Sequence, residues 1–158
     1  MKHWRKTSAS SSSRASTITA LAAATLLGAA CARDAAVRPS ALDVREAWAR
    51  TADSGAMTAV YFTLGNGGAE SDTLVGVEST VAERTEMHIS TQHGGMMRMS
   101  AVTSLPVPAD DSVMFQPLGA HVMLTGLNRP LVEGDSLSIT LRFTSGQTVE
   151  VRAGVRKP

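Results

Sequence analysis

The sequence predicts a single all-β domain built as a Greek-key sandwich or barrel. Short runs of alternating apolar and polar residues recur through most of the chain, and turn-forming residues separate them. No stretch after residue 50 repeats apolar residues at the 3.6-residue spacing of a helix. The chain has 158 residues, 43% of them hydrophobic and 18% charged, which suits one globular core rather than two.

The first 31 residues have the order of a secretory signal peptide. Four basic residues and no acidic ones occur in this segment, and a mostly apolar run of 13 residues lies at Ile18–Ala30. A helix that spans a membrane needs about 20 such residues. We therefore expect this segment to be cleaved rather than to remain as an anchor.

Cys31 is the only cysteine of the chain, and it directly follows the small residues Gly28-Ala29-Ala30. This position resembles a bacterial lipoprotein signal, in which the cysteine becomes the lipidated N-terminus; cleavage after Ala32 is the alternative. Both place the mature protein in the periplasm or cell envelope, and the first adds a membrane tether. Neither leaves a thiol for a disulfide, a cysteine-based zinc site or thiol catalysis.

Residues 32–42 carry alanine and proline without periodicity and are interpreted as a tether, so the folded domain is expected at residues 43–158. Beyond residue 31 the chain has 11 basic and 14 acidic side chains, a net charge of −3. A nucleic-acid partner is excluded, because nothing in this part forms the basic stripe that phosphates require.

The strands of the domain follow from alternation and from the turns between them. In residues 136–143, four apolar side chains from Leu137 to Phe143 alternate with polar ones. After a turn at Ser145-Gly146-Gln147, valines alternate with polar residues up to Arg156, which predicts a C-terminal hairpin. Six further short runs are predicted as strands: Ala59–Leu64, Thr73–Glu78, Arg84–Ser90, Met96–Val102, Ser112–Gln116 and Ala120–Gly126.

Methionine and histidine cluster at two places in the predicted sheet. Four of the eight methionines fall within thirteen residues that also hold two histidines; the six residues are Met87, His88, His93, Met96, Met97 and Met99. A second group is His121-Val122-Met123. Thioether sulfur is a soft, neutral ligand, and its combination with imidazole favours Cu(I) over hard cations and gives zinc little reason to bind. The pattern therefore indicates copper.

The first cluster predicts one pair of ligands across a hairpin. If Gly94 lies in the turn and paired residue numbers sum to 187, His88 is directly opposite Met99. The same register places Arg98 opposite Ile89, which requires either an exposed face or a bulge in the ladder.

The second cluster predicts the other pair on a single strand. His121 and Met123 are two residues apart, so both project from the same face, while Val122 and Leu124 point into the core. Brought together by the sandwich, the two pairs would form a site of two nitrogen and two sulfur ligands near solvent.

Purely structural explanations compete with this interpretation. Methionine is a common core residue, and we assign Met87 and Met114 to packing. His93 beside the turn is expected to be solvated. Five aromatic residues are too few and too scattered for a stacking platform, and most of them are expected in the core: Trp48, Tyr61, Phe62, Phe115 and Phe143. Packing explains less well why four donor side chains occupy compatible positions on two pairs of strands.

The spacing His88, ten residues, Met99, twenty-one residues, His121, one residue, Met123 resembles the pattern of the periplasmic copper chaperone family PCuAC. The resemblance extends over nearly all of the mature domain. Further segments that are similar to family landmarks are Ala47-Trp48-Ala49-Arg50, Ala59-Val60-Tyr61-Phe62, residues 72–77, Glu86-Met87-His88, residues 94–99, His121-Val122-Met123-Leu124 and residues 131–135.

The resemblance implies a cupredoxin-like β-sandwich in which His88, Met99, His121 and Met123 bind Cu(I). It also implies delivery of that ion to a copper protein, notably the binuclear centre of cytochrome c oxidase subunit II. Leu118 departs from the family pattern, which commonly has a glycine there, although no ligand is lost. Some members carry a tail rich in His and Met; this chain ends at Gly154-Val155-Arg156-Lys157-Pro158, so no second copper site is expected.

The predicted function is therefore an extracytoplasmic Cu(I) metallochaperone. A metal-free interaction module that uses the Met-rich surface is the alternative. A blue-copper electron carrier would need a Cys ligand that the domain lacks. An enzyme is not expected, since the sequence shows no recognisable catalytic constellation and four protein ligands leave the metal no open position for a substrate.

Overall fold

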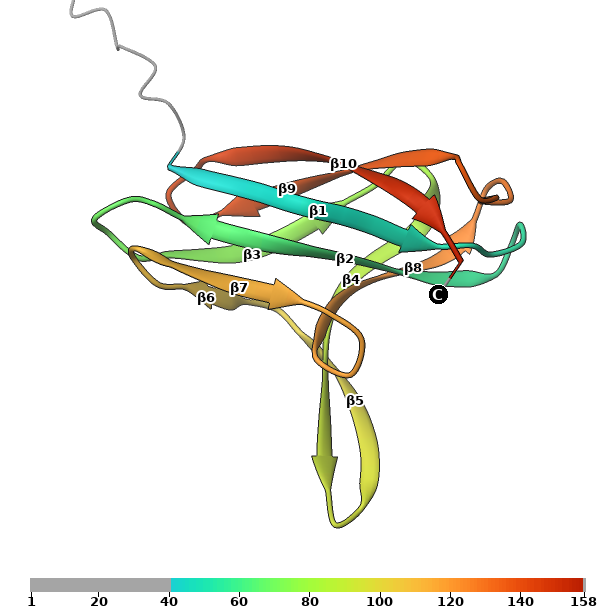
Figure 1. The fold of residues 1–158 in the computed structure, drawn as a ribbon, viewed down its shortest axis with the longest axis horizontal. Helices are drawn as coiled ribbons and strands as arrows, with labels where there is room; N and C mark the ends of the chain where they lie inside the picture. Colours follow the sequence, from blue (N-terminus) through green and yellow to red (C-terminus); the bar gives the residue numbers. More distant parts are fainter. Residues whose placement is uncertain (1–40, 158) are drawn as a thin grey trace, which may run out of the picture. The chain divides into compact units, whose positions relative to one another are not determined.

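The computed structural model describes residues 41–157, which contain ten β-strands (Figure 1). The strands are β1 (Leu42–Arg50), β2 (Met57–Asn66), β3 (Asp72–Glu78), β4 (Ala82–His93), β5 (Met96–Val102), β6 (Leu105–Val107), β7 (Asp111–Phe115), β8 (Ala120–Leu127), β9 (Ser136–Phe143) and β10 (Thr148–Arg156). Nothing in residues 41–157 is a helix that could cross a membrane. The predicted signal peptide, Cys31 and residues 32–40 of the tether lie outside the described residues.

The ten strands form one hydrogen-bonded ladder in the order β5-β4-β8-β7-β2-β1-β10-β9-β3-β6, with β8 also paired to β2. Apolar side chains from distant strands of this ladder meet in one core. Val60 on β2 and Val122 on β8 belong to the same fully buried cluster as Leu74 on β3 and Leu141 on β9. The prediction of an all-β fold is confirmed.

The C-terminal hairpin shows how closely alternation specifies a strand. In β9 the buried residues are those from Leu137 to Phe143 at every second position, whereas Ser138 and Arg142 are exposed. Antiparallel pairing with β10 places Ile139 opposite Val151, which is also buried. These residues therefore face the core as predicted.

Two strands are not identified from the sequence. In β1 the pairing with β2 shifts between Arg45 and Trp48, and Glu46 between them has φ 56°, so apolar residues do not alternate regularly. The short strand β6 has only three residues, with Pro106 at its centre, and lies at the edge of the ladder. Both irregularities remove the period of two on which the prediction depends.

The hairpin formed by β4 and β5 projects away from the other strands (Figure 1). Its turn is Gly94-Gly95, with φ 59° and 82°, and His93 pairs with Met96 on either side. A two-residue turn with positive φ at both positions suits the twist of a hairpin, and glycine adopts that conformation without steric cost. Paired residue numbers consequently sum to 189, and the predicted sum of 187 is wrong.

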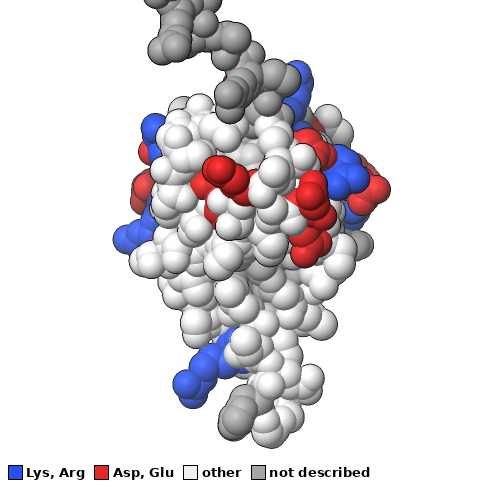
Figure 2. Space-filling view, turned by 90° about the vertical axis from the view of Figure 1, so that its left-hand side faces the viewer, with Lys and Arg blue, Asp and Glu red and all other residues white. Residues whose placement is uncertain are grey.

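This corrected register removes the conflict over Arg98. The residue pairs with Thr91 rather than Ile89, and both Arg98 and Thr91 are exposed on the projecting part of the hairpin. A bulge is therefore not needed. Arg98 is the only charged residue between positions 88 and 102, and the hairpin shows basic but no acidic colour in Figure 2.

Candidate metal centre

The two predicted histidine ligands face each other across neighbouring strands. His88 in β4 pairs directly with His121 in β8, and their ring centroids are 5.8 Å apart with 42° between the ring planes. Met123 lies two residues beyond His121 on β8, so its side chain projects from the same face of the sheet. Val122 and Leu124 are fully buried, as predicted, because they alternate with these two residues.

Met99 reaches the same face from β5, but not through the predicted pairing. It is opposite Ser90, and His88 is opposite Ala101, so Met99 and His88 are diagonal neighbours. Diagonal positions are about 7–8 Å apart, which long side chains can bridge. The Met99 side chain lines a cavity of about 310 Å³ together with His121 and Met123. Met99 is 51% exposed and lies on the open side of this cavity.

The imidazole of His121 is held in a fixed orientation by the loop that precedes its strand. Nδ1 is 3.1 Å from the carbonyl oxygen of Gly119, which can only accept a hydrogen bond, so Nδ1 carries the proton. The same carbonyl accepts a hydrogen bond from the backbone N–H of Ser90. The other nitrogen, Nε2, is buried and has no hydrogen-bond partner. Its lone pair is therefore free to bind a metal ion.

The imidazole of His88 has no hydrogen-bond partner on either ring nitrogen, although both atoms are buried. The carboxylate of Glu86 lies nearby, but its Oε2 is 3.7 Å from Nε2 and too far for a hydrogen bond. A buried polar atom without a partner costs about 1–3 kcal/mol. Both His88 and His121 have such unpartnered nitrogens. A metal ion bound by one nitrogen from each imidazole would remove part of this energetic cost.

Burial lowers the pKa of His121 below its ordinary value. The hydrogen bond to Gly119 opposes this shift, while the nearby charges of His88 and Arg50 add to it. The imidazole is thus neutral at neutral pH, which is the form that a metal ion requires.

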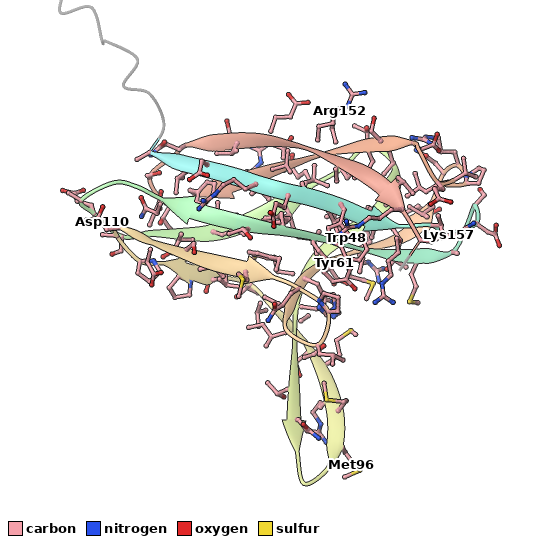
Figure 3. All side chains as sticks on the ribbon, in the orientation of Figure 1. Trp48, Tyr61, Met96, Asp110, Arg152 and Lys157 are labelled. Atoms are coloured by element: carbon pink, nitrogen blue, oxygen red, sulfur yellow. The ribbon has the colours of Figure 1, made fainter. Side chains whose placement is uncertain are left out.

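A row of aromatic and cationic side chains extends from the histidine pair across the sheet. Tyr61 lies 6.3 Å from His121 between ring centroids, and Trp48 lies 4.6 Å from Tyr61. Figure 3 shows these two aromatic side chains next to each other. Arg156 covers Trp48 at 4.1 Å, and Arg50 lies 5.6 Å from the centre of the Tyr61 ring. This row is not among the predicted site residues, although Trp48 and Arg50 are two residues apart on one strand and therefore project from the same face.

Leu118 lies at the rim of the cavity in a backbone conformation that favours glycine. Its φ is 66° and its side chain is 76% exposed. It stands in the loop between β7 and β8, next to Gly119, whose carbonyl orients His121. A side chain with a Cβ is strained in the left-handed region, whereas glycine is not.

We expect Leu118→Gly to raise the free energy of unfolding by about 0.5–1 kcal/mol, because relief of this strain exceeds the added chain entropy of glycine. Urea denaturation of the two proteins measures the difference. A decrease in stability would contradict the strained conformation.

The methionines Met87, Met96, Met97 and Met114 do not line the cavity. Met87 is 4% exposed and packs in the core, as predicted. Met114 is 57% exposed, so its assignment to packing is wrong. Met96 is 75% exposed and lies at the far end of the hairpin (Figure 3). The backbone of His93 is part of β4 opposite Met96; its side chain is outside the described set.

The donor atoms of the site suit a soft metal ion. No group of three or more His, Cys, Asp or Glu side chains that could hold a metal occurs among residues 41–157. The face described above instead offers two imidazoles and two thioethers, from His88, His121, Met99 and Met123. Neutral nitrogen and sulfur donors favour Cu(I) over hard cations such as Mg²⁺ or Ca²⁺.

Solved structures that share this fold include PCuAC domains. The copper-bound PCuAC domain of PmoF2 superposes with a TM-score of 0.62, at 23% identity over 75% of this chain and 94% of that domain. Apo-DR1885 from Deinococcus radiodurans has a TM-score of 0.57 at 32% identity and covers 100% of this chain and 97% of its own. The Cu(I) form of DR1885 superposes with a TM-score of 0.58 and is 37% identical, and the match covers 80% of this chain and 85% of DR1885. The cupredoxin-like fold of PCuAC domains is confirmed.

The family is shown by the sequence match. Residues 42–155 match the model of the family described as "Putative lipoprotein LpqE-like". The "Putative lipoprotein Lxx21020" of Leifsonia xyli subsp. xyli (strain CTCB07) is 34% identical over 116 residues, which are 73% of this chain and 69% of that protein. The chain belongs to the LpqE-like lipoprotein family.

Proposed function

We propose that this protein is an extracytoplasmic carrier of Cu(I), which it binds through His88, Met99, His121 and Met123. The observation that carries the proposal is the pair of facing imidazoles, whose buried nitrogens His88 Nδ1, His88 Nε2 and His121 Nε2 have no hydrogen-bond partner, beside two thioethers on one sheet face. The copper-bound and Cu(I)-bound relatives support it, because they share this fold. All four donors come from the protein, so the role is binding and transfer rather than catalysis.

The exposure of the ligands suggests the order in which they release copper. Met99 is half exposed at the open side of the cavity, whereas His121 is 3% exposed and fixed by Gly119. An incoming ligand from an acceptor protein would replace Met99 first and His121 last. Exposed apolar side chains that line the cavity, Met57 and Leu118, offer a surface for that acceptor.

The proposed acceptor is an extracytoplasmic copper protein such as subunit II of cytochrome c oxidase. Lipidation of Cys31 would tether the carrier to the membrane in which such an acceptor resides. Mixing the Cu(I)-loaded carrier with the purified copper-free domain of the acceptor, then separating and assaying both, measures the transfer. Copper that stays entirely on the carrier would exclude this acceptor but not the binding site.

X-ray absorption spectroscopy of the Cu(I)-loaded protein tests the ligand set directly. We expect two sulfur and two nitrogen scatterers around the ion. Equilibrium dialysis under reducing conditions provides the complementary measurement. A protein that retains no copper would overturn the proposal and favour the metal-free interaction module, with the exposed Met96 and Met97 as its surface.

Copper affinity is expected to fall as the pH falls, because protons compete with Cu(I) for the imidazole nitrogens. Since the pKa of His121 is lowered mainly by burial, its share of the loss should begin only below the ordinary histidine pKa. Competition with a Cu(I) chelator whose own pH dependence is known, between pH 7.5 and about 4.5, measures this. An affinity that is constant over this range would exclude histidine ligands.

A further inference from the structure

A cation without a carboxylate partner lies at the edge of the proposed copper site. Arg50 ends β1 and lines the same cavity as Met99, His121 and Met123. Its Nε is buried and has no hydrogen-bond partner, and no ion pair joins it to any carboxylate of residues 41–157. None of the described residues that line this cavity is acidic.

An aromatic ring, rather than an acid, holds the guanidinium in place. The Cζ atom of Arg50 is 5.6 Å from the centre of Tyr61, which is itself only 6% exposed and packs against Trp48. The π face of an aromatic ring attracts a cation without neutralising it. The full positive charge of Arg50 therefore remains beside His121, and it contributes to the lowered pKa of that residue.

A fixed positive charge next to a metal site opposes Cu(II) more strongly than Cu(I). The Coulomb energy is proportional to the product of the charges, so the repulsion of a doubly charged ion is twice that of a singly charged ion. The proposed ligands are all neutral when they bind and do not offset this repulsion. We propose that Arg50 sets the preference of the site for Cu(I) over Cu(II), an inference that rests on the proposed copper-carrier function.

Glu86 provides a charge of opposite sign on the other side of the site. Its Oε2 is 3.7 Å from Nε2 of His88, and its side chain is 43% exposed. Solvent screens the charge of this partly exposed carboxylate, whereas Nε of Arg50 is buried. Removing the acid should nevertheless change the preference in the opposite direction, which makes Glu86 an internal control.

The test is the ratio of Cu(I) to Cu(II) affinity, with each affinity measured by chelator competition in its own oxidation state. We expect Arg50→Gln to lower this ratio about five- to tenfold, mainly by strengthening Cu(II) binding. Arg50→Lys keeps the charge and should stay near the wild-type ratio, and Glu86→Gln should raise it. Arg152→Gln removes an equal charge from β10, where Arg152 contacts Ser136 far from the site residues in the ladder, and should change nothing.

Each outcome separates this inference from the function on which it rests. Wild-type protein that does not bind Cu(I) would overturn both. Normal Cu(I) binding with an unchanged affinity ratio in Arg50→Gln would overturn the role of Arg50 alone. The same conclusion would follow if Arg50→Lys lowered the ratio as much as Arg50→Gln does. Should Arg50→Gln not fold, Arg50→Leu keeps the apolar contact with Tyr61 and serves as the neutral variant.

Discussion

Replacing His121 by leucine is expected to lower the affinity for Cu(I) by more than about 100-fold, because even residues that only orient a ligand contribute about 10–100-fold. His121 donates the most buried and most rigidly held nitrogen of the proposed site. Chelator competition under anaerobic conditions measures the affinity. His93→Leu, at the end of β4 opposite Met96, is the matched control and should retain wild-type affinity.

The same variant should remain folded, which distinguishes a ligand from a structural residue. Leucine fills a similar volume and removes a buried Nε2 that has no partner. The carbonyl of Gly119 keeps its hydrogen bond from Ser90, so no new unpaired group arises there. We therefore expect the free energy of unfolding of the metal-free protein at pH 7 to be unchanged or increased.

The pH dependence of that stability gives a second, metal-free readout. The pKa of His121 is lowered in the folded protein, so between this value and the ordinary pKa the unfolded chain binds more protons. Wild-type stability should thus decrease as the pH falls through the ordinary pKa towards the folded one. His121→Leu should lack this component in urea denaturation series at pH 7 and below.

Wild-type Cu(I) affinity in the His121→Leu variant would show that the ligand assignment is wrong.

Alternation and turn chemistry predict most of this fold, and their limits are physical. The strand β9 is predicted correctly because half of its side chains lie in the core and half in solvent. The predicted turn is displaced by one residue, which shifts every pairing in the hairpin by two positions, because the sequence offers two placements of the turn around Gly94. Only the backbone resolves them, through positive φ at both Gly94 and Gly95.

The structure changes the pairing of the four proposed ligands but not the sheet face on which they lie. The predicted and observed registers both place Met99 on the same face as His88. The two registers differ by two positions along β5, and a shift of two leaves each side chain on its original face. The role of Arg50 escapes prediction for another reason. Its proximity to His121 depends on the order β1-β2-β8 across the sheet, which alternation within single strands does not determine.

Removing both thioethers is the second change with a large expected effect. Met99→Leu and Met123→Leu should each weaken Cu(I) binding about tenfold or more, and the double variant should weaken it further, since only the two imidazoles would remain. Leucine approximates the volume of methionine, so each substitution should cost less than about 1.5 kcal/mol of stability. Met114→Leu, on β7 opposite Thr63, is the control.

The two single variants should differ in kinetics because the two sulfurs differ in exposure. Met99 is half exposed and is the proposed first ligand to leave, so its loss should mainly accelerate transfer of copper to an acceptor or chelator. Met123 is partly buried between Ala59 and Glu86 on the neighbouring strands, so its loss should mainly reduce equilibrium affinity. Stopped-flow transfer measurements and X-ray absorption of both variants would test this division. If the double variant kept wild-type affinity and sulfur scattering, the copper ligands would have to lie elsewhere in the chain.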